Sequence, residues 1–184
     1  MKNYISSQSG RSMIEMLGVL AIVGVLSVAG IAGYSKAMAK YKTNRLIDQI
    51  STVVSYTQTR FAAQGNYKGC SGEVAYHLGL YPEEATKQCD IDGEYTSSCV
   101  KNVFGGMLDV FASDLSPEDF TVTVMNIPKD ACSALAAMDW GPSFVSIGPV
   151  LDAENLSAIE KAAKLCSCNG KGDCLISRVS IVFK

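Results

Sequence analysis

The sequence predicts an α+β fold in which one long N-terminal helix precedes a small antiparallel sheet, and three features support this fold class. The first is a run of twenty residues without a charge, from Met16 to Ser35. The second is an amphipathic helical pattern that follows this run. The third is the alternation of apolar residues with threonine from Phe120 to Val124, which is typical of a half-buried strand.

The uncharged run is long enough to cross a bilayer. Twenty helical residues at about 1.5 Å each reach roughly 30 Å, the thickness of the hydrocarbon layer. An ordinary secretory signal has a shorter apolar region and is then cleaved, whereas this run continues directly into the next helical segment. We therefore expect residues 16–35 to be retained as a transmembrane segment or a filament core, with an uncleaved signal anchor as the alternative. Four glycines in or near this run would permit close helix packing or local melting, unless they are simply tolerated: Gly18, Gly24, Gly30 and Gly33.

A helical face with a period of about 3.6 residues continues beyond the uncharged run. Its members are Leu46, Ile50, Val53, Val54, Thr57 and Phe61. The other faces are expected to carry the polar residues Lys42, Asn44, Arg45, Asp48 and Gln49. The pair Gly65-Asn66 is the first clear stop signal. The pattern predicts one helix over residues 11–64, about 80 Å long, whose second half packs on a globular domain.

The globular domain is expected to span residues 66–184. Strand patterns occur at 103–111, 143–147 and 178–183 as well as at 120–124. Pro128 suits the first turn of a helix that runs to Met138, and an Ala- and Lys-rich stretch from Leu156 to Leu165 predicts a second helix.

Charge and cysteine content limit the function classes. The chain has 16 basic and 18 acidic residues, so no basic surplus indicates binding to nucleic acid or to an anionic membrane surface. All seven cysteines follow the apolar run, and this density favours disulfides in an oxidising compartment. The alternatives are reduced, buried thiols or a zinc site. Zinc is disfavoured because the chain has Cys166-Ser-Cys168 in place of a CxxC pair and a single histidine, His77.

Glu15 is unusual because it stands at the edge of the apolar run. An ionised carboxylate costs on the order of 2.5–3.5 kcal/mol at a bilayer centre. It either marks the membrane interface or finds a cationic partner when helices bundle, and in the second case it would also fix their register.

The segment from Ser9 to Leu20, SGRSMIEMLGVL, resembles the processing motif of type IV prepilins. The resemblance implies that a prepilin peptidase cuts between Gly10 and Arg11 and methylates the new amine. Glu15 then becomes the fifth mature residue, which in this family answers the N-terminal amine of a neighbouring subunit. Arg11 stands where the family usually has Phe or Met.

A second resemblance concerns the globular domain. The segments at 102–106, 120–128 and 131–135 are similar to the core of type IVb pilins. In those proteins a cysteine of a second helix bridges back to the first helix. This implies a bridge from Cys132 to Cys166 or Cys168, with Cys166 favoured.

The remaining cysteines go beyond the single bridge of that family. Cys168 and Cys174 enclose a glycine-rich turn that could close a short loop. Among Cys70, Cys89 and Cys99, the pair Cys89–Cys99 is favoured. One thiol is then left over, either free and buried or cross-linking subunits.

The sequence contains no pattern that indicates a catalytic site, a metal site or a cofactor. The acidic stretch from Asp90 to Glu94 departs from the EF-hand pattern and is expected to be a solvated turn. The chain has no phosphate-binding loop, dinucleotide fingerprint or nucleophile elbow. Cys166-Ser-Cys168 also lacks the context of a redox pair.

The resulting prediction is a non-enzymatic major pilin, with residues 1–10 as a prepilin leader. Its partners would be its own copies in a helical homopolymer, the prepilin peptidase, an assembly platform and an outer-membrane secretin. The chain would sit in the inner membrane with a periplasmic domain before assembly and in an extracellular pilus afterwards, serving adhesion, aggregation, motility or DNA uptake. The alternatives are a minor pilin or type II secretion pseudopilin and, from another class, a membrane-anchored periplasmic enzyme or binding domain.

Overall fold

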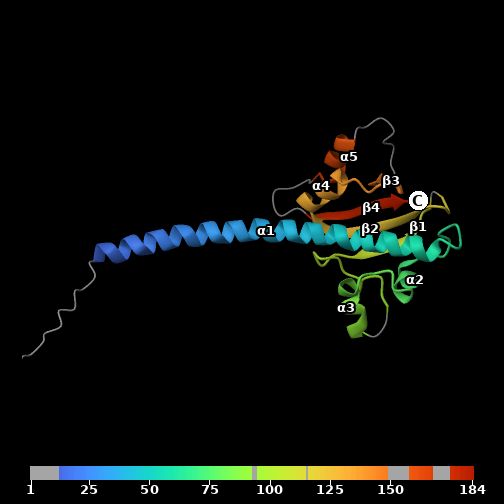
Figure 1. Ribbon diagram of the computed structural model, residues 1–184, viewed down its shortest axis with the longest axis horizontal. Coiled ribbons are helices and arrows are strands. Elements are labelled where there is room, and N and C mark those ends of the chain that lie inside the picture. Colours follow the sequence, from blue (N-terminus) through green and yellow to red (C-terminus); the bar gives the residue numbers. More distant parts are fainter. Residues whose placement is uncertain (1–12, 93–94, 115, 149–157, 168–174) are drawn as a thin grey trace, which may run out of the picture. The chain divides into compact units, whose positions relative to one another are not determined.

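The computed structural model describes residues 13–92, 95–114, 116–148, 158–167 and 175–184 (Figure 1). It separates into two compact units, Met1–Tyr41 and Lys42–Lys184. The chain forms an α+β fold with one long helix and a four-stranded antiparallel sheet, as the sequence predicts.

The long helix α1 spans Met13–Phe61 and contributes to both units. In the first unit its large apolar side chains are exposed, and by length and composition this part could cross a membrane. The helix ends at Phe61, three residues before the expected Gln64. The next residues form turns, and Gly65 adopts a positive φ of 68°, which favours glycine over residues with a side chain.

In the second unit the predicted apolar face of α1 is confirmed. All six of its members are buried: Leu46, Ile50, Val53, Val54, Thr57 and Phe61. The expectation for Gln49 was wrong, because its side chain is only 3% exposed. Burial is possible because both ends of the Gln49 amide have hydrogen-bond partners within the domain.

The sheet has the strand order β1-β2-β4-β3, and each neighbouring pair is antiparallel. The strands are β1 (Leu108–Ala112), β2 (Phe120–Pro128), β3 (Phe144–Ile147) and β4 (Leu175–Phe183). All four predicted strands therefore exist. The strand expected from Val103 starts only at Leu108, since the preceding residues form a turn closed by Asn102 and Gly106.

The core lies between α1 and one face of the sheet. Val122 of β2 is opposite Val110 of β1 and Ile181 of β4, and all three side chains are fully buried. The prediction that β2 is half buried was wrong. Thr121 and Thr123, which alternate with the core residues, are also buried, and the Thr123 hydroxyl lies 3.0 Å from that of Ser180.

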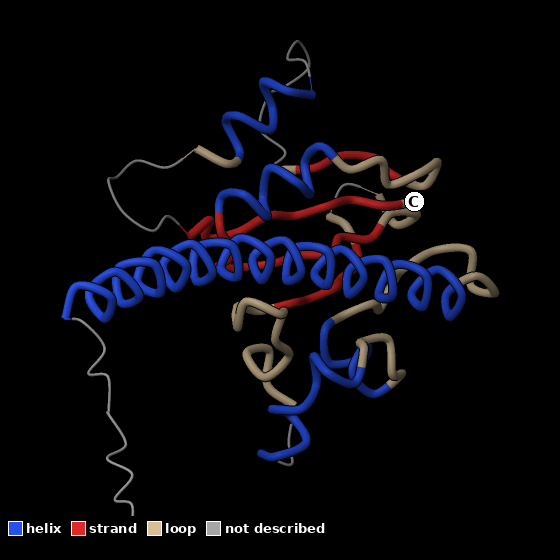
Figure 2. The backbone as a smooth tube through the Cα atoms, turned by 60° about the vertical axis from the view of Figure 1, so that its left-hand side comes forward, coloured by secondary structure: helices blue, strands red, loops and turns tan. Residues whose placement is uncertain are grey.

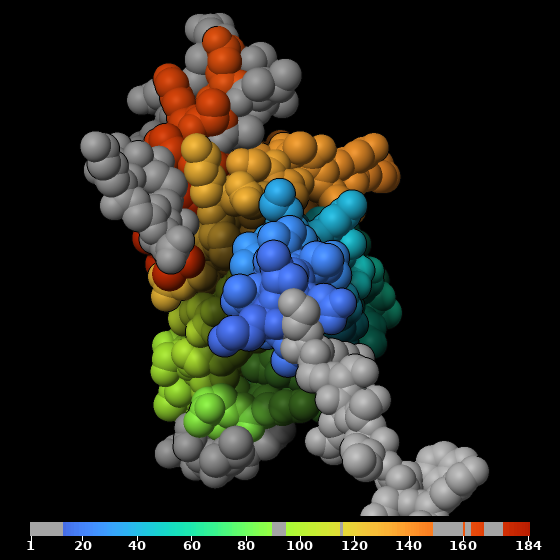
Figure 3. Space-filling view, turned by 90° about the vertical axis from the view of Figure 1, so that its left-hand side faces the viewer, coloured from blue at the N-terminus to red at the C-terminus, as the bar shows by residue number. Residues whose placement is uncertain are grey.

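In the part of the chain that the structure describes, four shorter helices flank the packed half of α1: α2 (Gly72–His77), α3 (Glu83–Asp92), α4 (Lys129–Ala137) and α5 (Ala158–Leu165). Figures 1 and 2 show α4 and α5 on one side of α1 and α2 and α3 on the other. In the space-filling view, the residues of α4, in orange, and those of α3, in green, lie at opposite ends of the second unit (Figure 3). The helices α4 and α5 match the two predicted helices.

The helices α2 and α3 were not predicted. The acidic stretch from Asp90 to Glu94 was expected to be a solvated turn. This expectation was wrong for Asp90 to Asp92, which form the last residues of α3. Pro82 precedes this helix, and Glu83 and Glu84 occupy its first turn, where negative charge complements the helix dipole.

Candidate assembly site

Glu15 lies in the first turn of α1, two residues after the start of the described helix. Its neighbours Met13, Ile14, Met16 and Leu17 are all exposed, with exposed fractions from 49% to 87%. The structure therefore presents one carboxylate at the end of an apolar helical surface. The predicted cleavage residues Gly10 and Arg11 lie outside the described residues.

The glycines in the apolar half of α1 have open space around them. A Cβ atom built at Gly18, Gly24, Gly30 or Gly33 meets nothing within 4 Å. Within the described residues, steric contacts therefore do not require glycine at these positions. Small residues here would permit close packing against another helix.

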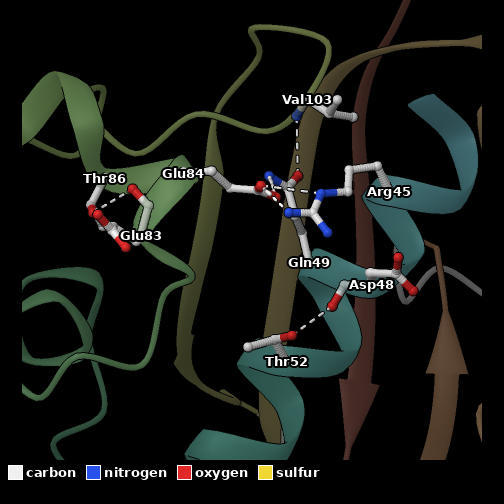
Figure 4. Close-up of polar contacts among 8 residues, drawn as sticks. All are labelled: Arg45, Asp48, Gln49, Thr52, Glu83, Glu84, Thr86 and Val103. Atoms are coloured by element: carbon white, nitrogen blue, oxygen red, sulfur yellow. Dashed lines mark hydrogen bonds and ion pairs between the residues drawn. The ribbon is translucent and has the colours of Figure 1, made fainter. Parts of the chain in front are cut away.

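A polar network fixes the packed half of α1 to the segments around it (Figure 4). Gln49 donates from Nε2 to Glu84 Oε1 at 3.0 Å, and Gln49 Oε1 accepts from the backbone N–H of Val103 at 3.1 Å. Arg45 donates from Nε to Glu84 Oε2 at 3.1 Å and forms an ion pair with the same carboxylate. Arg45 and Gln49 of α1 therefore connect this helix to α3, and Gln49 also connects it to the turn before β1.

Among the described residues, two disulfides join elements of the second unit. Cys89 in α3 is bonded to Cys99 with a Cα–Cα distance of 4.9 Å. Cys132 in α4 is bonded to Cys166, just after α5, with a Cα–Cα distance of 5.8 Å. These are the two favoured pairings. Cys168 and Cys174, the third expected pair, lie outside the described residues.

Cys70 is the one described cysteine that is not in a disulfide, and it is buried. Burial, together with the negative charge of Asp109, raises the pKa of its thiol to about 11. The thiolate is the reactive form, so this environment makes Cys70 a poor nucleophile. Of the two fates expected for the odd thiol, the structure supports the free and buried one.

A polar cluster around Asp109 of β1 was not predicted from the sequence. Asp109 Oδ1 accepts a hydrogen bond from the Tyr81 hydroxyl at 3.2 Å and one from the Val110 N–H at 2.9 Å. Burial raises the pKa of Asp109, although these hydrogen bonds and the charge of Arg178 act in the opposite direction. The Tyr95 hydroxyl and Asp109 also crowd Gly72. The one signal in the sequence was Asp109 itself, an acid between the apolar residues Leu108 and Val110 of a predicted strand.

Comparison with known proteins adds the family context. Residues 36–180 match the family model described as Bundlin. The major structural subunit of the bundle-forming pilus of Escherichia coli O111:H- is 24% identical over 149 residues, which cover 80% of this chain and 74% of that protein. The same subunit of Escherichia coli O127:H6 (strain E2348/69 / EPEC) matches with the same identity and coverage.

Among solved structures, the crystal structure of TcpA, a type IV pilin from Vibrio cholerae El Tor biotype, matches with 17% sequence identity and a TM-score of 0.44. The match covers 79% of this chain and 98% of that chain.

Proposed function

This chain belongs to the bundlin family and is a type IV pilin, and we propose that it is the major structural subunit of a pilus. Its proposed parts are the leader at residues 1–10, the long helix at 11–64 with its membrane or filament-core segment at 16–35, and the globular domain at 66–184. Its activity is polymerisation, and no enzymatic step of its own is proposed.

The observation that carries the proposal is the exposed apolar half of α1. Burial of a large apolar side chain contributes about 1.5–3 kcal/mol, and a helix with many such exposed side chains needs a membrane or other helices around it. Before assembly the inner membrane supplies this environment. In the filament the helices of neighbouring copies supply it.

Glu15 is proposed to set the step between copies. Cleavage between Gly10 and Arg11 would create a positively charged amine four residues before Glu15. A carboxylate and an amine from two subunits neutralise each other in an apolar bundle only when the subunits are in step. This arrangement would select one register of the helices over the others.

The proposed partners follow from the route to the surface. A prepilin peptidase would process the chain at the cytoplasmic face, and an assembly platform would extract it from the inner membrane. An outer-membrane secretin would let the filament pass. The disulfides support a periplasmic location of the globular domain, because such bonds persist in oxidising compartments.

Electron microscopy of cells with and without the gene tests the proposal. We expect surface filaments that are absent from the deletion strain and return on complementation, with this chain as their dominant protein. If the chain forms only a trace component of the filaments, it is a minor pilin. If the filaments of the deletion strain are unchanged in number and composition, the proposed function is wrong.

The intact mass of the chain purified from filaments tests the processing step. We expect a mass that starts at Arg11, with the added mass of one methyl group. A chain that starts at Met1 would refute cleavage between Gly10 and Arg11.

The variant Glu15→Ala tests the role of the carboxylate. We expect this variant to accumulate in the inner membrane at the normal level but to form few or no filaments. Asp114→Ala, which removes an exposed acid from the loop between β1 and β2, is the control and should assemble normally. Normal filaments from Glu15→Ala would exclude the charge-pairing role.

A further inference from the structure

The apolar part of α1 is followed directly by a positively charged segment. Residues 36–47 contain four basic residues and no acidic residue. The charges of the whole chain nearly balance, so this excess is local. Basic residues next to a membrane span lie at the depth of the lipid headgroups, and each of them needs a partner there or within the protein.

The two basic residues closer to the globular domain have partners within the protein. Arg45 forms an ion pair with Glu84. The Lys42 ammonium group lies 6.0 Å from the centre of the Phe104 ring, a distance at which a cation is attracted to the ring face.

The other two basic residues, Lys36 and Lys40, differ in this respect. Both are exposed, and within the described part of the chain neither forms an ion pair. They are four residues apart, so they extend from the same side of the helix and repel each other. An anion from outside the subunit would relieve this repulsion.

Two tyrosines accompany these lysines. Tyr34 and Tyr41 are 66% and 63% exposed. They are seven residues apart, and at 3.6 residues per turn they share the side of the helix roughly opposite the lysines. Tyrosine is enriched where a membrane meets water, because its ring is apolar and its hydroxyl is polar. We call Tyr34, Lys36, Lys40 and Tyr41 the collar; all four belong to the first unit.

The distance from Glu15 to the collar matches one bilayer. Lys36 follows Glu15 by 21 residues of continuous helix. At about 1.5 Å per residue this is roughly 31 Å, and the hydrocarbon layer is about 30 Å thick. When the collar lies among the headgroups of one leaflet, Glu15 reaches the opposite surface. Neither the carboxylate nor the lysines then enter the apolar layer, where charge is costly.

These features identify the occupant of the collar. Headgroups surround a membrane helix on all sides, which suits lysines on one side and interfacial tyrosines on the other. The positive charge of the lysines selects lipids with a net negative charge. We propose that the collar binds the phosphate groups of anionic phospholipids in the periplasmic leaflet of the inner membrane. This inference rests on the proposed function, because it takes residues 16–35 as a membrane span before assembly.

The expected preference follows from the charge of the two lysines. A basic residue near an anionic membrane surface favours it about fivefold, and salt screens this attraction. At low salt we therefore expect phosphatidylglycerol to be favoured next to the collar over the neutral phosphatidylcholine by about fivefold or more. The preference should largely disappear at high salt.

Lipid quenching of fluorescence tests the preference with the full chain in phosphatidylcholine vesicles. Tyr34→Trp places a reporter in the collar, and brominated acyl chains quench only tryptophans close to them. The signal of Trp140, the one tryptophan of the chain, is measured without the reporter and subtracted. We expect brominated phosphatidylglycerol to quench the reporter at a membrane fraction about fivefold lower than brominated phosphatidylcholine.

Charge variants assign the preference to the collar. Lys36→Gln combined with Lys40→Gln should remove it, whereas Lys36→Arg combined with Lys40→Arg should keep it, because arginine retains the charge. The matched control is Lys68→Gln combined with Lys87→Gln. These two lysines are exposed in the second unit, so their loss lowers the net charge equally and should leave the preference unchanged.

The outcomes separate this inference from the proposed function. Equal quenching by the two lipids, or a preference that survives in the Lys36 and Lys40 glutamine variant, would overturn the lipid proposal alone. Equal quenching together with a loss of filaments from that variant would show that the lysines pair with acidic groups of another protein. A reporter that neither lipid quenches would show that α1 is not inserted, and would contradict both proposals.

Discussion

Gln49 of α1 and Glu84 of α3 are joined by a hydrogen bond of 3.0 Å from Nε2 to Oε1, and Gln49 also accepts the Val103 N–H. We expect Gln49→Leu to lower the free energy of unfolding by about 1–3 kcal/mol, because partly buried polar groups lose their partners. Urea unfolding of the full chain in detergent measures this change.

Arg45→Ala is the matched control for the same network. The Arg45 side chain is 44% exposed, and its ion pair with Glu84 should contribute about 1 kcal/mol or less. If the two variants lose the same stability, the central role of Gln49 is wrong.

The raised pKa of Asp109 predicts that this carboxyl makes the folded domain less stable as the pH rises. Its pKa is raised by burial, so the folded state binds a proton more tightly than the unfolded state does. From about pH 4 up to the raised pKa, the free energy of unfolding should therefore fall as the pH rises. Thermal unfolding across this range measures the effect.

Asp109→Asn should remove this contribution and be more stable than the wild type at pH 7, since the amide oxygen can still accept from Tyr81 and Val110. Asp114→Asn, on an exposed loop, is the comparison variant. A pH profile of Asp109→Asn that matches the wild type would show that this carboxyl does not titrate as expected.

Gly72 and Gly106 both lie so close to other atoms that a side chain would collide, but we expect replacement by alanine to cost different amounts of stability at the two positions. A Cβ at Gly106 would collide with the backbone carbonyl of Met125, which cannot move without disturbing β2. A Cβ at Gly72 would meet the ends of the Tyr95 and Asp109 side chains, which can turn away. We expect Gly106→Ala to cost about 3 kcal/mol or more and Gly72→Ala clearly less. Equal losses of stability would contradict this reasoning.

Of the two disulfides, the one that closes the longer loop should contribute more to stability. Cys132 and Cys166 are 34 residues apart, and Cys89 and Cys99 are 10 apart. In the chain-entropy model, removal of the first bridge costs about 4 kcal/mol and removal of the second about 3 kcal/mol. Paired serine variants, compared by denaturant unfolding, test this order. The opposite order would show that factors other than chain entropy dominate.

The regular elements could be predicted because each has a period that short-range chemistry imposes. The buried face of α1 repeats every three or four residues from Leu46 to Phe61, and all four strands carry apolar or alternating patterns. The start of β1 was misplaced by five residues, since Val103 and Phe104 are apolar but belong to a turn organised by Asn102.

The polar parts of the domain could not be predicted, because their partners are distant in the sequence. Gln49 has the polarity of a surface residue and is buried only because Glu84 and Val103 meet it in the fold. Asp109 likewise depends on Tyr81, 28 residues away. The helices α2 and α3 are short and have too few turns for an apolar period to stand out.

The burial of Cys70 affects how stable the disulfides of a free subunit are. With a pKa of about 11, only on the order of one Cys70 thiol in ten thousand is ionised at neutral pH, so its exchange with disulfides is slow. Subunits in an oxidising compartment would therefore keep their original bridges. The other four described cysteines are already paired, so we expect no covalent link between copies through the described residues.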